Sequence, residues 1–282
     1  MRLRHGVTAA HAIKTLRDLA MSLETARAAV VGSDGLRRSR DQYLSWVDNA
    51  ENQLRNLFAE VDLLDSLHSE RYWRIHNLDH YSARPAALLI AEIDLQLGLL
   101  LGTADRLESY RQLAERPGEV LVLDTNTFMH CTLFTQIDWL KEFNAEAVRL
   151  VLPLLVLDEL DDKTFSAHAR LSKRASKVLR TLDPFMDRVV EAGAAEIAPG
   201  VVLEVLHDDE SHRRRGNNDT ELLDRAEFLM QVIERPVTLV TTDYGMRVRS
   251  KARNLRVRVM PERLRLPLSA TTEFPPPSGP TD

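Results

Sequence analysis

The chain has 282 residues, which is enough for one large or two medium domains. Its formal net charge of -5 excludes a protein that coats nucleic acid through positive charge over its whole surface. A single cysteine, Cys131, excludes an internal disulfide and fits the reducing cytoplasm, which is the location we expect.

Residues 1–116 are predicted to be a helical bundle or coiled-coil region, with three long helices separated by breaks at 33–35 and 77–85. The clearest apolar stripe has the heptad-like spacing of paired helices and consists of Val47, Ala50, Leu54, Leu57, Val61 and Leu64. Such a stripe must be buried. Either a homo-oligomer forms through these helices, or the stripe packs inside a three-helix bundle of one chain.

The most apolar stretch of the chain, residues 85–102, is long enough to raise the question of a membrane span. It contains Glu92 and Asp94, which are costly in a lipid environment. We therefore expect a buried central helix and no membrane partner.

Residues 117–267 are predicted to form an α/β domain after the turn at Arg116, Pro117 and Gly118. Short runs rich in valine and leucine predict strands at 120–123, 151–157, 201–206, 237–241 and 255–260. Helical segments between most of them indicate right-handed crossovers and a parallel sheet flanked by helices. The proline-rich residues 268–282 are expected to be a disordered tail.

Four acidic residues stand where the predicted strands end or the following helices begin: Asp124, Glu159, Asp219 and Asp243. Ligands of open α/β sheets bind outside the carboxyl ends of the strands. Carboxylates gathered there repel one another unless a cation is present, and oxygen ligands suit Mg²⁺ or Mn²⁺. The pattern predicts metal-dependent phosphodiester chemistry.

Each acid also has a simpler interpretation. Asp219 and Asn218 could cap a helix, with Glu221 completing a capping box. Glu159 could stabilise a helix N-terminus through the helix dipole, and Asp243 could hold a turn. All four must coincide at strand ends for these interpretations to suffice, so we favour a shared site.

At these residues the chain resembles a PIN domain, the metal-dependent ribonuclease fold, over residues 119–267. Asp124 is followed by Thr125 and Asn126, Glu159 follows an apolar run, Asp219 precedes Leu222 and Leu223, and Asp243 follows Thr241 and Thr242. The resemblance implies a ribonuclease that uses Mg²⁺ or Mn²⁺ and cleaves RNA, most readily single-stranded and internally, with the four acids as catalytic and metal-binding residues. It implies nothing about the N-terminal helices.

Positive and small polar side chains predict where the substrate lies. One face of a predicted helix carries Arg170, Lys173, Arg174 and Lys177, a surface that suits a phosphate backbone or is simply solvated. Arg214 lies in a polar loop before Asp219 and is expected to hold RNA near the metal. The residues expected to orient water or phosphate, unless they only stabilise turns, are Thr125, Asn126 and Thr242.

Two other functions stay open. A non-catalytic RNA-binding or assembly module could keep the fold, although the presence of all four acids favours an enzyme. A metal-dependent phosphatase would act on small phosphomonoesters and would not need extended cationic faces. The haloacid-dehalogenase type of phosphatase requires a second aspartate where Asn126 stands, which weakens that version of the alternative.

Overall fold

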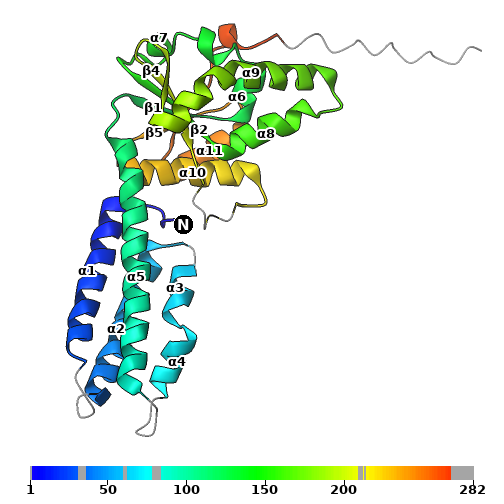
Figure 1. The fold of residues 1–282 in the computed structure, drawn as a ribbon. Helices are drawn as coiled ribbons and strands as arrows, with labels where there is room; N and C mark the ends of the chain where they lie inside the picture. The colour runs from blue at the N-terminus through cyan, green and yellow to red at the C-terminus, as the bar shows by residue number, and fades with distance from the viewer. Residues whose placement is uncertain are drawn as a thin grey trace, which may run out of the picture.

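The computed structural model of the protein describes residues 2–30, 36–59, 62–77, 84–208, 212 and 214–267. Two groups of elements are visible in Figure 1: helices α1 to α5 form an elongated bundle, and a sheet with its own helices lies at one end of it. The predicted break at 33–35, most of the one at 77–85, and the predicted disordered tail at 268–282 fall outside the described residues.

The bundle contains three long helices, as the sequence predicts, and two short ones. The long helices are α1 (Ala9–Ala28), α2 (Leu36–Leu57) and α5 (Pro85–Arg111). The short ones are α3 (Asp62–Leu67) and α4 (Glu70–His76), and Ser69 caps α4 by accepting a hydrogen bond from the amide of Tyr72. The heptad-like stripe therefore does not run along one continuous helix, because α2 ends at Leu57 and Leu64 belongs to α3.

The stripe is buried inside one chain. Val47, Ala50 and Leu54 have no exposed surface, and α2 packs against α1 and α5. Val61 lies outside the described residues. The apolar spacing that suggested paired chains is therefore satisfied by an intramolecular bundle, which removes that pattern as an argument for a homo-oligomer.

Helix α5 is long and apolar enough to cross a membrane by length and composition alone, but it contains polar residues that belong to the bundle. Glu92 is fully buried, and its Oε1 accepts hydrogen bonds from Tyr43 (3.2 Å), Ser69 (2.8 Å) and Gln96 (2.9 Å). These partners come from α2, from the residue that caps α4 and from α5 itself. The expected buried helix is thus buried on one side, while Leu95 and Leu101 on the other stay exposed.

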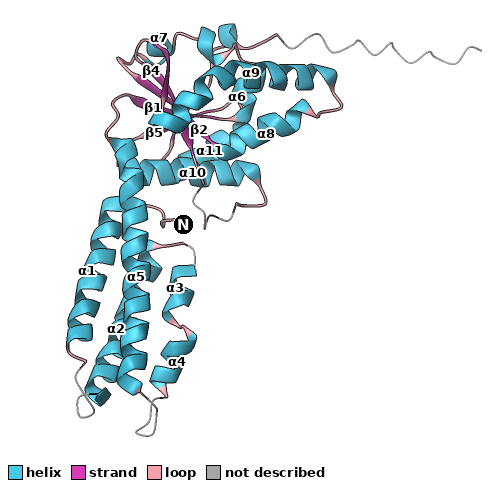
Figure 2. Ribbon diagram, viewed as in Figure 1, coloured by secondary structure: helices cyan, strands magenta, loops and turns pink. Residues whose placement is uncertain are grey.

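A mixed sheet of six strands in the order β3-β4-β2-β1-β5-β6 forms the centre of the second part. Figure 2 shows its strands in magenta among the surrounding helices. Every neighbouring pair is parallel except β3 and β4. The strands are β1 (Glu119–Leu123), β2 (Val148–Pro153), β3 (Ala195–Ala198), β4 (Val201–Leu206), β5 (Val237–Val240) and β6 (Arg256–Arg258). The predicted α/β class is confirmed.

One strand prediction is wrong in its bounds, and one strand was not predicted. The strand expected at 151–157 begins earlier and ends at Pro153, and the apolar residues after it start helix α8 (Leu154–Thr164). Strand β3 was not expected at all. It is short, contains two alanines, and joins the sheet edge as the antiparallel partner of β4.

The remaining helices are α6 (Thr125–His130), α7 (Trp139–Phe143), α9 (Ala169–Ala192), α10 (Asn218–Ile233) and α11 (Tyr244–Ala252). Short 3₁₀ helices follow α5 (Gln112–Ala114), α6 (Phe134–Gln136) and β6 (Glu262–Leu264). Strand ends at β1 and β5 lead directly into α6 and α11, which places polar residues at one edge of the sheet.

Helix α10 connects the bundle to the sheet (Figure 1). It contacts α1 and α5 as well as β5, and most of its residues are buried. Arg2 lies 3.0 Å from the carboxylate of Asp224, and the Nε2 of Gln231 donates to the carbonyl of Arg4 at 2.7 Å. Helix α10 is therefore held by the N-terminal segment of the chain as well as by the bundle and the sheet.

Candidate active site

Asp124 and Asp243 follow neighbouring strands. Strands β1 and β5 are paired in parallel, with Leu123 opposite Val240, so the residues after them emerge at the same edge. Asp124 is the N-cap of α6 and Asp243 is the N-cap of α11. Asp243 therefore does stabilise the turn into α11, as the simpler interpretation expects. Its position at the neighbouring strand end also brings its negative charge close to Asp124.

Asp124 is a buried carboxylate with both oxygens held. Its Oδ1 accepts hydrogen bonds from the amide and the hydroxyl of Thr127, both at 2.6 Å, and its Oδ2 accepts one from the Thr241 hydroxyl. Burial raises the pKa of Asp124 above its ordinary value, although the hydrogen bonds from Thr127 and Thr241 act in the opposite direction. The charge of Asp243 raises the pKa further, so a nearby cation would favour the ionised form.

A pocket of about 210 Å³ opens beside Asp124. Three of the four predicted acids line it, and they come from segments far apart in the chain: Asp124 after β1, Glu159 on α8 and Asp219 on α10. The polar residues that share this lining are Thr125, Asn126, Lys163 and Asn218, and the apolar ones are Leu155, Leu222 and Met246. We call this the carboxylate pocket.

Glu159 lies in the second turn of α8 rather than at a helix start, because the helix begins at Leu154. The simpler interpretation through the helix dipole is therefore weakened. Its two oxygens are held from two sides: Thr125 donates its hydroxyl to Oε2, and Asn218 donates its Nδ2 to Oε1 at 2.6 Å. These bonds fix the carboxylate toward the pocket between α6 and α10.

Asp219 lies in the first turn of α10 but does not cap it. Asn217 is the N-cap, accepting from the amide of Thr220 at 2.9 Å, so the predicted capping role of Asp219 and Asn218 is wrong. Glu221 does not complete a capping box either, since it binds His212 and the amide of Arg215. The side chain of Asp219 is 54% exposed and pairs with Arg249 at 2.8 Å.

Asp243 stands next to the carboxylate pocket and not in its lining. Its Oδ1 accepts from the amide of Met246 at 2.7 Å, and its own amide donates to the Thr241 hydroxyl at 3.1 Å. That hydroxyl donates in turn to Asp124, so Thr241 links the two strand ends. Thr242, predicted to orient substrate, is half-buried and is not part of the lining.

Sequence reasoning missed three polar residues of this site. Lys163 and Asn218 line the pocket, and Thr241 orients Asp124. Asn218 could have been found, because it directly precedes Asp219. Lys163 lies four residues after Glu159, a spacing that puts both side chains on the same face of α8.

The predicted substrate face on α9 is divided in two by the structure. Arg170, Lys173 and Lys177 are exposed. Arg174 turns inward, and its guanidinium donates to the carbonyls of Phe128, at 2.7 Å, and Cys131. Burial lowers the pKa of Arg174 below its ordinary value, and its hydrogen bonds hold the end of α6 against α9.

Arg214, expected to hold RNA, is engaged by acids of the protein itself. Its Nε donates to Asp208 at 2.6 Å and its Nη1 donates to Asp158 at 2.5 Å. Asp158 is the residue before Glu159. Arg214 thus connects the segment before α10 to α8, next to the carboxylate pocket.

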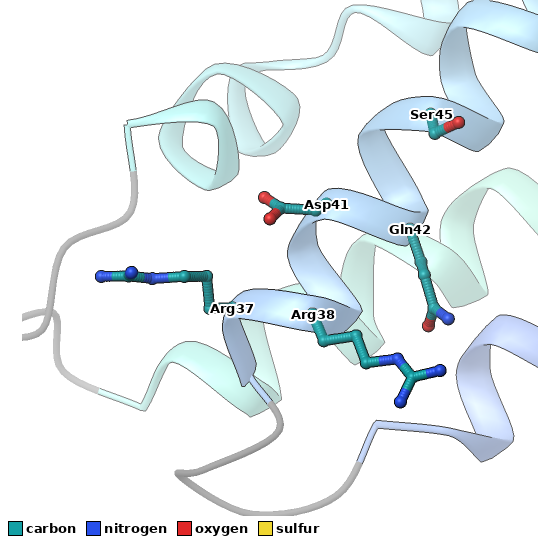
Figure 3. Close-up of a pocket in the computed structure, with 5 residues that line it drawn as sticks. All are labelled: Arg37, Arg38, Asp41, Gln42 and Ser45. Atoms are coloured by element: carbon teal, nitrogen blue, oxygen red, sulfur yellow. The ribbon is translucent and has the colours of Figure 1, made fainter.

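A second hollow lies in the bundle at the start of α2, far along the chain from the four acids. It is lined by Arg37, Arg38, Asp41, Gln42 and Ser45, which Figure 3 shows around its opening. With a single carboxylate and two guanidinium groups, this lining is unsuited to a divalent cation. The carboxylate pocket is the better candidate for metal chemistry.

Residues 121–260 match the family model of the PIN domain. These residues form a PIN domain. The match spans β1 to the segment after β6, and it includes all four acids. A comparison with curated proteins found no match to the chain. PIN domains are usually nucleases and typically use divalent metal ions, so the family agrees with the chemistry that the pocket permits.

Proposed function

We propose that this protein is a divalent-metal-dependent ribonuclease that cleaves RNA internally by hydrolysis of phosphodiester bonds. The observation that carries the proposal is the convergence of Asp124, Glu159 and Asp219 on one pocket, with Asp243 at the neighbouring strand end. A fold alone does not specify an activity. Carboxylates gathered from three separate segments, with a fourth at the neighbouring strand end, do favour one.

The donor set fits Mg²⁺ or Mn²⁺. All four side chains offer oxygen ligands, which these hard cations prefer, and burial together with the charge of Asp243 raises the pKa of Asp124, which a bound cation would offset. Asp124, Glu159 and Asp219 would hold the ion, and Asp243 would hold a second ion or a water. Such an ion, when bound, supplies an acidic water and neutralises charge at the phosphate.

The other residues of the pocket have positioning roles in this proposal. Thr125 and Asn218 fix the two oxygens of Glu159, and Thr241 and Thr127 fix those of Asp124. Asn126 and Lys163 line the pocket with groups that donate hydrogen bonds, which suits phosphate oxygens. Thr242 stays a weaker candidate for the same task.

Substrate RNA would approach over the exposed cations of α9. Arg170, Lys173 and Lys177 give that surface positive charge in a protein whose net charge is negative. Arg214 would take part only by leaving Asp158 or Asp208, because it is bonded to both. We therefore assign the first contact with RNA to α9 and not to the loop before α10.

A closed circle of single-stranded RNA tests the proposal, because it has no end for an exonuclease to use. With Mg²⁺ or Mn²⁺ the protein should convert the circle to linear fragments, and a chelator should stop the reaction. A circle that is bound but never opened would favour the non-catalytic RNA-binding module. Release of phosphate from a small aryl phosphate with no cleavage of RNA would favour the phosphatase.

A further inference from the structure

Three potential metal ligands meet beside the PIN domain's carboxylate pocket without being part of its lining. Asp208 lies just after β4, His212 lies in the segment that follows, and Glu221 lies in the first turns of α10. One ligand atom from each lies within 4.8 Å of the other two. Asp219 and Glu221 are two positions apart on α10, so their side chains leave the helix on nearly opposite sides.

This group differs from an ordinary solvated acidic cluster because its side chains have little exposed surface, that of Asp208 being the most exposed at 16%. The side chains of His212 and Glu221 are only 5% and 2% exposed. The His212 Nε2 lies 2.6 Å from Oε1 of Glu221.

Two polar atoms of the group have no hydrogen-bond partner among the described residues. They are Nδ1 of His212 and Oδ1 of Asp208, and both are buried. Buried polar atoms without a partner are few in native proteins, and an ion is one recognised reason for them. Both atoms belong to residues whose chemistry suits a metal.

We propose that Asp208, His212 and Glu221 bind a divalent transition-metal ion of the zinc class, at a site separate from the carboxylate pocket. An imidazole nitrogen favours Zn²⁺ and similar ions over Mg²⁺, whereas the carboxylate pocket offers only oxygen. Three protein ligands leave a fourth position for water in tetrahedral coordination.

The spacing needs a moderate adjustment to accept such an ion. With metal–ligand distances of about 2.0–2.2 Å, ligand atoms around one tetrahedral zinc ion lie roughly 3.3–3.6 Å apart. The observed limit of 4.8 Å exceeds this by up to about 1.5 Å. Asp208 lies outside any helix or strand, where such a shift costs least.

Neighbouring groups hold the ligands in the way that metal sites require. The second oxygen of Glu221 accepts from the Arg215 amide at 2.8 Å, and the second oxygen of Asp208 accepts from Arg214 at 2.6 Å. The Nε of Arg225 forms an ion pair with Oδ1 of Asp208 at 3.5 Å without a hydrogen bond, while the Nη2 of Arg225 donates to the carbonyl of His207 at 2.6 Å. A bound ion would take the place of that longer contact.

Zinc binding to protein without a histidine tag tests this proposal. Competition with a chromophoric chelator should give one tight Zn²⁺ equivalent, and His212→Gln should weaken it by at least about tenfold. Asp208→Asn should weaken it as well. His168→Gln, an exposed histidine of the same PIN domain, is the matched control and should bind like the parent. Circular dichroism checks that each variant is folded.

The double variant Asp124→Asn, Asp219→Asn separates this site from the carboxylate pocket. It should keep the tight Zn²⁺ equivalent even if it loses every nuclease activity, so the two proposals can fail independently. X-ray absorption of the parent protein with one equivalent of Zn²⁺ should show one imidazole among oxygen ligands, whether or not the variants fold. No tight binding, binding unchanged in His212→Gln, or a spectrum without imidazole would overturn the proposal.

Discussion

The Nδ2 of Asn218 lies 2.6 Å from Oε1 of Glu159, and this bond joins the start of α10 to the second turn of α8. The other oxygen of Glu159 accepts from Thr125 at the start of α6. One carboxylate therefore receives donors from two separate segments, each of which carries another acid of the pocket. Asp124 precedes Thr125, and Asp219 follows Asn218. The proposed metal ligands are thus positioned by their own neighbours in sequence.

The role of Asn218 gives the first prediction. Asn218→Ala removes the donor to Glu159 and should lower kcat/KM for RNA by about 10–100-fold, the usual effect of losing a group that orients a metal ligand. Asn218→Asp places a negative charge beside Glu159 and should lower it further. Cleavage rates under metal-saturating conditions measure both. Asn52→Ala, on the exposed side of α2, is the control, and equal rates in Asn52→Ala and Asn218→Ala would contradict this role.

The exposed cations of α9 give the second prediction. Replacing Arg170, Lys173 and Lys177 with glutamine should weaken binding of single-stranded RNA and reduce the slope of log K against log salt by about 2, since each phosphate contact contributes roughly 0.7. Filter binding at several salt concentrations measures this slope. A triple variant with the parent's slope would show that this face serves solubility alone.

The inward turn of Arg174 gives the third prediction. Its charge-assisted hydrogen bonds to backbone carbonyls contribute about 1.5–3 kcal/mol in partly buried positions, so Arg174→Gln should lower the free energy of unfolding by roughly that amount. Lys173→Gln, its exposed neighbour, should change stability by less than about 0.5 kcal/mol. Urea unfolding compares the two, and equal stability would mean that Arg174 has no structural role.

Much of this arrangement was predictable from sequence, and the failures have physical causes. Asp124 and Asp243 were placed correctly, because valine-rich runs ending in an acid define parallel strand ends. Residues 154–157 were mistaken for strand, since a short apolar run fits a buried helix equally well. Pro153 supplied the missing signal, as proline commonly stands where a helix begins.

Some contacts between distant segments could not be predicted. The stripe on α2 shows that a surface must be buried, but spacing alone does not tell whether the partner belongs to the same chain. The sequence spacing places Arg174 on the same helical face as Lys173 and Lys177. Its side chain nevertheless points inward, because it donates to the carbonyls of Phe128 and Cys131. The short strand β3 has little β-propensity of its own and depends on pairing with β4.

The pH dependence of stability gives the fourth prediction. Burial raises the pKa of Asp124 in the folded protein, so the folded state binds this proton more tightly than the unfolded chain. The resulting stabilisation is present below the unfolded pKa of about 3.9 and is lost as the pH rises through the folded value. In chelator, the parent should therefore lose stability relative to Asp124→Asn as the pH rises from about 4 towards neutrality.

Urea unfolding of both proteins at a series of pH values measures this difference. Asparagine caps a helix as well as aspartate does, so the cap of α6 is kept and the titration of residue 124 is isolated. If the free energies of unfolding of the two proteins kept a constant difference over the whole pH range, the ionised, buried Asp124 would not destabilise the folded protein. Adding Mn²⁺ should raise the free energy of unfolding of the parent near neutral pH and leave that of Asp124→Asn unchanged.

The most direct measurement is the single-turnover rate of RNA cleavage by Asp124→Asn, with Asp161→Asn as the matched control. Asp161 is an exposed acid of α8 that does not line the carboxylate pocket. With Mg²⁺ or Mn²⁺ in excess, Asp124→Asn should be at least about a hundredfold slower than the parent while staying folded, and Asp161→Asn should match the parent. Cleavage by Asp124→Asn at the parental rate would contradict the proposal that this pocket holds the catalytic metal.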